Sequence, residues 1–413
     1  MAMGATTLAS YVFQTIMARI LSTLEFGELS SMVATLNIVT IPIFGLGMAI
    51  TRDVAAKSSG GSAQVAALTL PYTRRVGIIT LTVVLGVLVL SPWLRAFLQL
   101  SSLVPLVFLM LLVTLTNLVG MGRALLLGLH DFTSSAVNQV VEAVIRLASS
   151  IAFAAAGFAS AAGFGGYLAG LCAALLFVIA RIPSETRSLF IAPWRSPDQG
   201  GESRVSAFTS YDHSGDISWQ AIIVTGAFIV LLNMDLVVVK HFLPPTEAGQ
   251  YAAVGTLARV LFVITNAFDV VLFPAAAAAR AAGTAGSSHL RTAILSVATI
   301  IIPLLAVYWL TAAPLLNVVF GARYVEVAPL LAPYGVSTSL LGVSTLIARY
   351  RLAVGRPIPS VALLALVAGA AIGFIAFHES LAEIVGVLLA AAVASLGIAL
   401  TGAMGPRRGL ALA

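Results

Sequence analysis

The chain has 413 residues, of which 60% are hydrophobic and 9% are charged, whereas about 25% of the residues in an ordinary soluble domain are charged. This composition excludes a water-soluble globular protein. Because a bilayer-spanning helix takes about 20 apolar residues, the chain holds material for about twelve spans. Its apolar runs are long and continuous, which favours helices over a membrane barrel, whose strands alternate apolar and polar residues. We therefore predict an all-α integral membrane protein.

Twelve candidate spans follow one another along the chain. They lie near residues 3–22, 28–50, 76–92, 103–122, 134–157, 161–181, 217–241, 250–273, 291–312, 327–348, 358–377 and 382–403. The longest polar connection, 183–216, separates two sets of six spans. We predict an N-terminal six-helix half at 1–182, a cytoplasmic linker at 183–216, and a C-terminal six-helix half at 217–413, with a central cavity between the halves.

A short internal repeat supports the division into halves. The segment 21–29 (LSTLEFGEL) aligns with 243–251 (LPPTEAGQY) at an offset of 222, and both segments contain a Glu-x-Gly motif that we interpret as a turn. Gly128 and Gly355 repeat the relation at an offset of 227. Since each half has an even number of spans, the two halves are expected to have the same orientation, as in transporters built from parallel repeats.

The basic residues predict the orientation of the chain. If both termini face the cytoplasm, sixteen of the twenty-two Lys and Arg residues fall in cytoplasmic connections, in agreement with the positive-inside rule. Arg123 and Arg351 are two of these sixteen, each just beyond a predicted span. Topology accounts for the formal net charge of +6, so we expect no nucleic-acid partner.

The fifth span contains an ionisable pair. Glu142 and Arg146 are four residues apart, so they share a helix face and can pair. The same stripe also contains Ser135, Asn138, Gln139 and Ser149. Two interpretations stay open, because charged residues inside a span either neutralise one another where helices pack or line a water-filled cavity. In the sixth span, Gly166 and Gly170 form a small-xxx-small packing face.

Three ionisable residues lie inside spans of the second half. Asp235 interrupts the seventh span, and the eighth contains Arg259, Asn266 and Asp269. Arg259 and Asn266 share a face, with Asp269 roughly 80° away around the helix. We predict that one or more of the three charged residues faces an aqueous cavity, since charges within membranes are costly. The alternative is that they pair with neighbouring helices and fix the packing.

Several kinds of chemistry have no support in the sequence. No Gly-x-x-x-x-Gly-Lys-Ser/Thr loop is present, which argues against ATP-driven pumping. The five histidines are scattered without paired spacing and the single cysteine is Cys172, so no metal site is expected. We expect neither a cofactor nor an enzymatic activity.

The order of the motifs resembles a known family. The motifs are 18–27 (ARILSTLEFG), 123–132 (RALLLGLHDF), 235–251, 319–324 (VFGARY) and 352–356 (LAVGR). In this order, which covers nearly the whole chain, they resemble the bacterial polysaccharide and lipid-linked oligosaccharide exporters of the multidrug/oligosaccharidyl-lipid/polysaccharide (MOP) exporter superfamily. Fewer residues precede the first span than in these exporters, so the resemblance implies that Met1 is a truncated or misassigned start.

The resemblance implies a flippase in the bacterial cytoplasmic membrane. Such a protein moves an undecaprenyl-diphosphate-linked oligosaccharide by alternating access, for cell-surface polysaccharide biosynthesis. It implies coupling to a proton, a sodium ion or the membrane potential, and a glycan polymerase or glycosyltransferases as partners. The candidates for the substrate headgroup are Arg259, Arg19, Arg146 and Asn266. The candidates for ion coupling or charge balance are Glu142, Asp235 and Asp269.

Other functions compete with the flippase. An ion-coupled exporter of drugs or small molecules from the same superfamily would favour an acid-rich cavity, whereas the charged residues inside the spans are two arginines and three acids. A membrane-embedded glycosyltransferase or polymerase would need catalytic carboxylates and sizeable loops on the outer side. Acids occur there at Glu326, Glu379 and Glu383, but the loops are short. A purely structural scaffold is the least favoured alternative.

Overall fold

The computed structural model describes residues 2–57, 62–184, 186–187, 216–281, 288–356 and 358–401. These residues form helices, and no strand occurs among them. The side chains of a few residues within the helices, including Asp269, lie outside the description. The predicted linker, 183–216, also lies almost entirely outside it.

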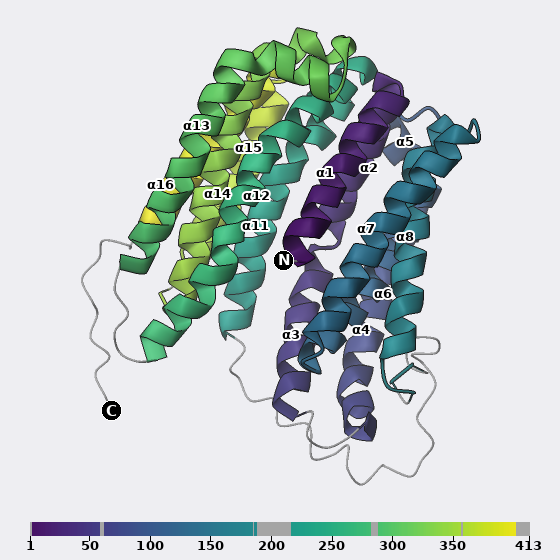
Figure 1. The fold of residues 1–413 in the computed structure, drawn as a ribbon, viewed down its shortest axis with the longest axis vertical. Coiled ribbons are helices and arrows are strands. Elements are labelled where there is room, and N and C mark those ends of the chain that lie inside the picture. The colour runs from purple at the N-terminus through teal and green to yellow at the C-terminus, as the bar shows by residue number, and fades with distance from the viewer. Residues whose placement is uncertain are drawn as a thin grey trace. The chain divides into compact units, whose positions relative to one another are not determined.

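Each predicted span coincides with helical structure (Figure 1). The first group of helices is α1 (Ala2–Ile20), α2 (Thr23–Val39), α3 (Ile41–Lys57), α4 (Ser62–Val89), α5 (Ser91–Phe97), α6 (Val104–Gly128), α7 (Phe132–Ala155) and α8 (Ala159–Arg181). The second group is α11 (Asp216–Phe242), α12 (Pro245–Ala281), α13 (Ser288–Val319), the 3-10 helix η3 (Ala322–Leu330), α14 (Leu331–Ala353), α15 (Ser360–Ala376) and α16 (Leu381–Leu400).

The helices confirm a multi-pass membrane protein. Among the described residues, nine helices are long and apolar enough to cross a membrane. The pair α2 and α3, bent by 48°, gives a tenth span if it is taken as one. The helices α1 and α15 are not among these ten, and with them each of the twelve predicted spans corresponds to one helix or to the bent pair.

The repeated Glu-x-Gly motif lies at the beginning of a helix in both copies, and not in the turn that the sequence predicts. In α2, Ser22 is the N-cap: its Oγ accepts a hydrogen bond from the Glu25 amide at 3.2 Å, and the Ser22 amide donates to Glu25 Oε2 at 2.9 Å. This reciprocal capping box satisfies amides that a helix start leaves unpaired. In the second copy, Glu247 lies in the first turn of α12.

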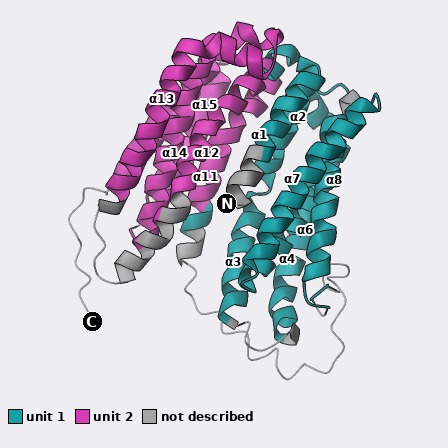
Figure 2. Ribbon diagram, in the orientation of Figure 1, with its two compact units in different colours: residues 1–222, 244–249 teal, residues 223–243, 250–413 magenta. Residues whose placement is uncertain are grey.

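The chain divides into two compact units (Figure 2). Unit 1 contains Met1–Ile222 and the short segment Pro244–Gly249. Unit 2 contains Ile223–Leu243 and Gln250–Ala413. The beginnings of α11 and α12 therefore belong to unit 1, whereas the rest of both helices belongs to unit 2.

Within unit 1, α7 and α8 pack at the distance that glycine permits. A Cβ atom on Gly170 would lie 2.7 Å from the carbonyl oxygen of Glu142, and one on Gly166 would lie 2.7 Å from that of Arg146. The predicted small-xxx-small face of α8 thus packs on the turn of α7 that contains its two charged residues. Small residues of this kind let helix backbones approach closely in membrane proteins.

Within unit 2, Arg351 joins the ends of two helices. The sequence placed it in a cytoplasmic connection, which is wrong, because α14 continues for five residues beyond the predicted span end at 348. Its side chain is buried, and Nη1 donates hydrogen bonds to the carbonyl oxygens of Ala399 at 3.0 Å and Thr401 at 2.7 Å. The last carbonyls of a helix lack partners within the helix, so Arg351 satisfies the C-terminal end of α16.

Replacing Arg351 with alanine should lower the free energy of unfolding by about 1–3 kcal/mol, because two carbonyl groups at the end of α16 lose a charged donor. The measurement is thermal unfolding of the purified protein in detergent. Arg291→Ala removes the same charge from an exposed position on α13 and is the matched control. Equal unfolding midpoints for the two variants would contradict the stabilising role of Arg351.

Candidate functional site

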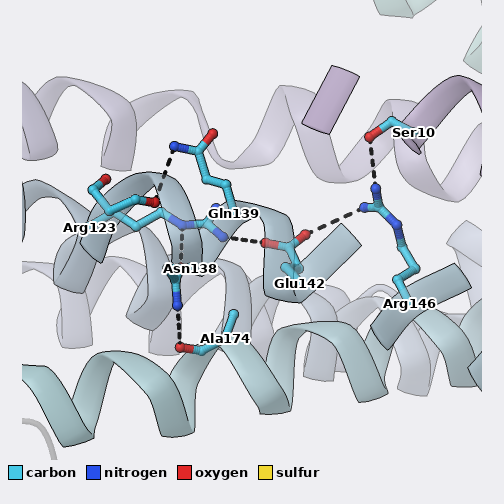
Figure 3. A network of polar contacts seen from close by, with 8 residues as sticks. Ser10, Arg123, Asn138, Gln139, Glu142, Arg146 and Ala174 are labelled. Carbon is cyan, nitrogen blue, oxygen red and sulfur yellow. Dashed lines mark hydrogen bonds and ion pairs between the residues drawn. The ribbon is translucent and has the colours of Figure 1, made fainter. Parts of the chain in front are cut away.

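A carboxylate in unit 1 lies between two guanidinium groups (Figure 3). Arg123 on α6 donates from Nη2 to Glu142 Oε2 at 2.6 Å, and Arg146 donates from Nη1 to Glu142 Oε1 at 3.4 Å. The predicted pairing of Glu142 with Arg146 along α7 is therefore confirmed. The additional partner, Arg123, comes from a neighbouring helix.

Asn138 holds Arg123 in place. It lies one turn before Glu142 on α7 and is fully buried. Its Oδ1 accepts a hydrogen bond from Arg123 Nε at 2.6 Å, and its Nδ2 donates to the carbonyl oxygen of Ala174 on α8 at 2.7 Å (Figure 3). Because the Asn138 amide is itself anchored by α8, the Arg123 guanidinium is fixed by α7 and α8 together.

Arg146 is fixed by α1 and α8 rather than by Glu142 alone. Its Nη2 donates to Ser10 Oγ at 2.7 Å. Its guanidinium carbon lies 5.2 Å from the ring centroid of Phe13 and 4.7 Å from that of Tyr167, within the range of cation–π attraction. The side chain is 7% exposed, and its buried Nε has no hydrogen-bond partner.

These groups form a positively charged patch, which we call the unit 1 network: Ser10, Arg123, Asn138, Glu142 and Arg146. Two guanidiniums and one carboxylate give it a formal charge of +1. The helices α6 and α7, which carry four of its five residues, are both candidate membrane spans. A charge within a span persists where it is paired or faces a water-filled cavity, and the excess of one positive charge makes the network suited to an anion.

Arg123 is a site residue that the sequence did not predict, because α6 is longer than the predicted fourth span. The predicted fourth span ends at 122, so Arg123 falls in the predicted cytoplasmic connection that follows it. The helix α6 instead continues to Gly128, which places Arg123 within it, opposite the polar stripe of α7. The signal that could have found Arg123 is that stripe, since a buried amide such as that of Asn138 requires hydrogen-bond partners from other helices.

A second charged cluster lies in unit 2. Asp235 on α11 is fully buried, and its Oδ1 accepts a hydrogen bond from Arg259 Nη2 at 3.0 Å. Its Oδ2 accepts from the hydroxyl of Tyr251 at 3.0 Å and from that of Tyr334. Arg259 Nη2 also donates to the Tyr334 hydroxyl at 2.9 Å. We call these four residues the unit 2 cluster; its formal charge is zero, and its geometry corresponds to the packing alternative for Asp235 and Arg259.

The other predicted site residues lie elsewhere. Arg19 is exposed in the last turn of α1, and Asn266 is half-buried on α12. The side chain of Asp269 is outside the described part of the structure. Their roles toward a substrate or an ion stay predictions. Within the described ranges, no group of three or more His, Cys, Asp or Glu side chains could hold a metal ion.

Solved structures with the same fold are membrane transporters. One is an inward-facing multidrug resistance MATE family transporter of the MOP superfamily. The match includes 96% of this chain and 92% of the transporter, with a TM-score of 0.71 and 12% sequence identity. Another is the lipid II flippase MurJ in an inward closed conformation. The match includes 98% of this chain and 87% of the MurJ chain, with a TM-score of 0.70 and 14% sequence identity. A third is a eukaryotic MATE transporter. The match includes 98% of this chain and 93% of that transporter, with a TM-score of 0.59 and 13% sequence identity. The chain therefore has the fold of MOP-superfamily transporters.

A family model identifies the family within this class of transporters. Residues 1–280 match the model of the polysaccharide biosynthesis protein family. This match covers more than half of the chain, so the protein belongs to that family. No curated protein matches the sequence.

Proposed function

We propose that the protein is a flippase that moves an undecaprenyl-diphosphate-linked oligosaccharide, or a related polysaccharide precursor, across the bacterial cytoplasmic membrane. It has no enzymatic activity and no bound cofactor, and transport is coupled to a proton, a sodium ion or the membrane potential. Both termini face the cytoplasm. A glycan polymerase or glycosyltransferases supply or receive the substrate.

The unit 1 network is the observation that carries this proposal. A diphosphate cannot cross hydrocarbon unaided, because a buried charge without a partner is prohibitively costly. Arg123 and Arg146 offer two guanidinium forks at membrane depth, and the planar fork of guanidinium matches phosphate oxygens. In a member of the polysaccharide biosynthesis family, an anionic glycolipid is the substrate class that fits this charge.

The drug exporter of the same superfamily fits the network less well. A cationic drug would need a binding region with an excess of carboxylates, whereas Glu142 is outnumbered by its two arginine partners. The likeness to MATE transporters is a likeness of fold at 12% and 13% identity. The sign of the charge therefore favours the flippase over the exporter.

Replacing Arg146 with alanine should slow flipping of a fluorescent lipid-linked oligosaccharide in proteoliposomes about tenfold or more, because a hydrogen bond to a charged group contributes about 1.5–3 kcal/mol. The protein should remain folded, since Arg123 still neutralises Glu142. Arg146→Lys keeps the charge without the fork and should be intermediate.

Arg75→Ala is the control, because it removes the same charge from an exposed position on α4. It should leave flipping unchanged. A wild-type rate in folded Arg146→Ala would contradict the role of the unit 1 network. Efflux of a cationic drug by the wild-type protein, without glycolipid flipping, would replace the flippase with the exporter.

A further inference from the structure

Glu142 lies closer to one of its two arginine partners than to the other. Its contact with Arg123 is short, at 2.6 Å, whereas the contact with Arg146 is 3.4 Å, near the upper limit for a hydrogen bond. Arg146 also retains a buried Nε without an acceptor. The carboxylate therefore satisfies Arg123 well and Arg146 poorly.

The position of Arg146 does not depend on Glu142. Ser10, Phe13 and Tyr167 surround the guanidinium and come from α1 and α8. If the carboxylate moved away, these three side chains would still hold Arg146 in its place. A guanidinium with a fixed position and an incompletely used set of donors is a prepared anion site.

We propose that the Glu142 carboxylate is a built-in anion that neutralises Arg123 and Arg146 in the empty site, and that a phosphate ester binds by displacing it from Arg146. This inference deepens the proposed function and rests on it only for the identity of the natural ligand, a diphosphate ester. Glu142 thereby sets the affinity of the site: a ligand must compete with a carboxylate that is already in place.

The charges explain why a diphosphate can displace a carboxylate. With Glu142 between the arginines, the network carries a formal charge of +1, so it still attracts an anion. A diphosphate ester has several oxygens and more than one negative charge, so it can accept from both guanidiniums at once. A monovalent anion carries no more charge than Glu142 and therefore does not compete with it. The carboxylate thus makes the site selective for multivalent anions.

Calorimetric titration of the full chain in detergent with inorganic pyrophosphate tests the proposal. Glu142→Gln removes the competing charge and should tighten binding roughly 5- to 150-fold, the usual range of coupling between two sites. Glu142→Asp keeps the charge, so both arginines stay neutralised during folding. Its shorter side chain weakens the hold on Arg146, and its affinity should lie between those of wild type and Glu142→Gln.

Asp53→Asn is the matched control. It removes one carboxylate from a different arginine–carboxylate pair of unit 1. In this pair, Arg52 Nε donates to Asp53 Oδ1 at 2.9 Å, and the Arg52 and Asp53 side chains are 51% and 28% exposed. Its pyrophosphate affinity should equal that of the wild type. An equal gain in Asp53→Asn would overturn the proposal, because the gain would then reflect net charge alone.

The remaining outcomes separate the inference from the proposed function. Binding to Glu142→Gln or Glu142→Asp that is no tighter than wild type overturns the inference, while flipping by the wild-type protein would still support the function. Tighter binding by both variants supports the anion site, even where the wild-type protein flips no lipid-linked oligosaccharide. In that case the function fails and the ligand is a different phosphate ester.

Discussion

Replacing Arg259 with alanine should lower the free energy of unfolding by about 3–5 kcal/mol, the cost of leaving one charge of a buried pair without its partner. Asp235 is fully buried, and the Arg259 side chain is only 16% exposed. The hydroxyls of Tyr251 and Tyr334 would still donate to the carboxylate, but neither carries a positive charge. Thermal unfolding in detergent, compared with wild type under the same conditions, measures the loss.

The double variant Asp235→Asn/Arg259→Gln is the control for this prediction. It removes both charges together, so no isolated carboxylate remains, and it should recover much of the stability that the single variant loses. The difference between the two variants measures how much of the loss comes from the isolated buried carboxylate. If the double variant unfolds as readily as Arg259→Ala, the loss comes from packing volume and the buried charge is not its cause.

This expectation changes how transport by Arg259 variants is interpreted. From the sequence, Arg259 is the first candidate for the substrate headgroup. In the structure its Nη2 donates to Asp235 and Tyr334 and joins α12 to α11 and α14. Loss of export in Arg259→Ala would therefore report loss of folding unless stability is measured beside it.

Replacing Gly249 with alanine should destabilise the protein by about 3 kcal/mol, the upper end of the usual cost of overpacking. A Cβ atom there would collide with the carbonyl oxygen of Thr23 and lie 2.6 Å from its carbonyl carbon. Both neighbours are backbone atoms, so no side chain can rotate away. In the reverse direction, a Cβ atom on Gly27 would lie 2.8 Å from the Gly249 amide nitrogen.

Gly120→Ala on α6 is the control for Gly249→Ala. A Cβ atom on Gly120 meets no atom within 4 Å, so this substitution should be neutral or stabilise by about 0.4–1 kcal/mol through the unfolded chain. Both variants are measured by thermal unfolding in detergent. Equal midpoints would show that the segment Pro244–Gly249 accommodates a methyl group by moving away from α2.

The helices were predictable because a membrane imposes strong constraints on sequence. Apolar runs of sufficient length gave the positions of the spans, and the spacing of Glu142 and Arg146 gave their pairing. The small-xxx-small face at Gly166 and Gly170 was also visible. The repeat at an offset of 222 identified Gly27 and Gly249 as equivalent positions, although nothing in it showed that the two glycines touch.

The partners of the charged residues were not predictable, because they come from other helices. Arg123 was missed because the predicted helix end lies six residues before the end of α6 at Gly128. Tyr251 and Tyr334 have large apolar rings and did not interrupt the hydrophobic pattern. Their hydroxyls nevertheless donate hydrogen bonds to the carboxylate of Asp235. Side-chain hydrogen bonds between helices depend on packing, and a pattern within one helix does not contain that information.

The aromatic enclosure of Arg146 has a thermodynamic consequence. An arginine in water samples many rotamers, and fixing a side chain of this kind on binding costs about 0.5–1.5 kcal/mol. Here the rings of Phe13 on α1 and Tyr167 on α8, which contact each other edge to face, confine the guanidinium before any ligand arrives. The entropy of ordering Arg146 is therefore lost during folding. A Phe13→Ala protein would lose that entropy at each binding event instead, and its affinity for anions would fall more steeply as the temperature rises.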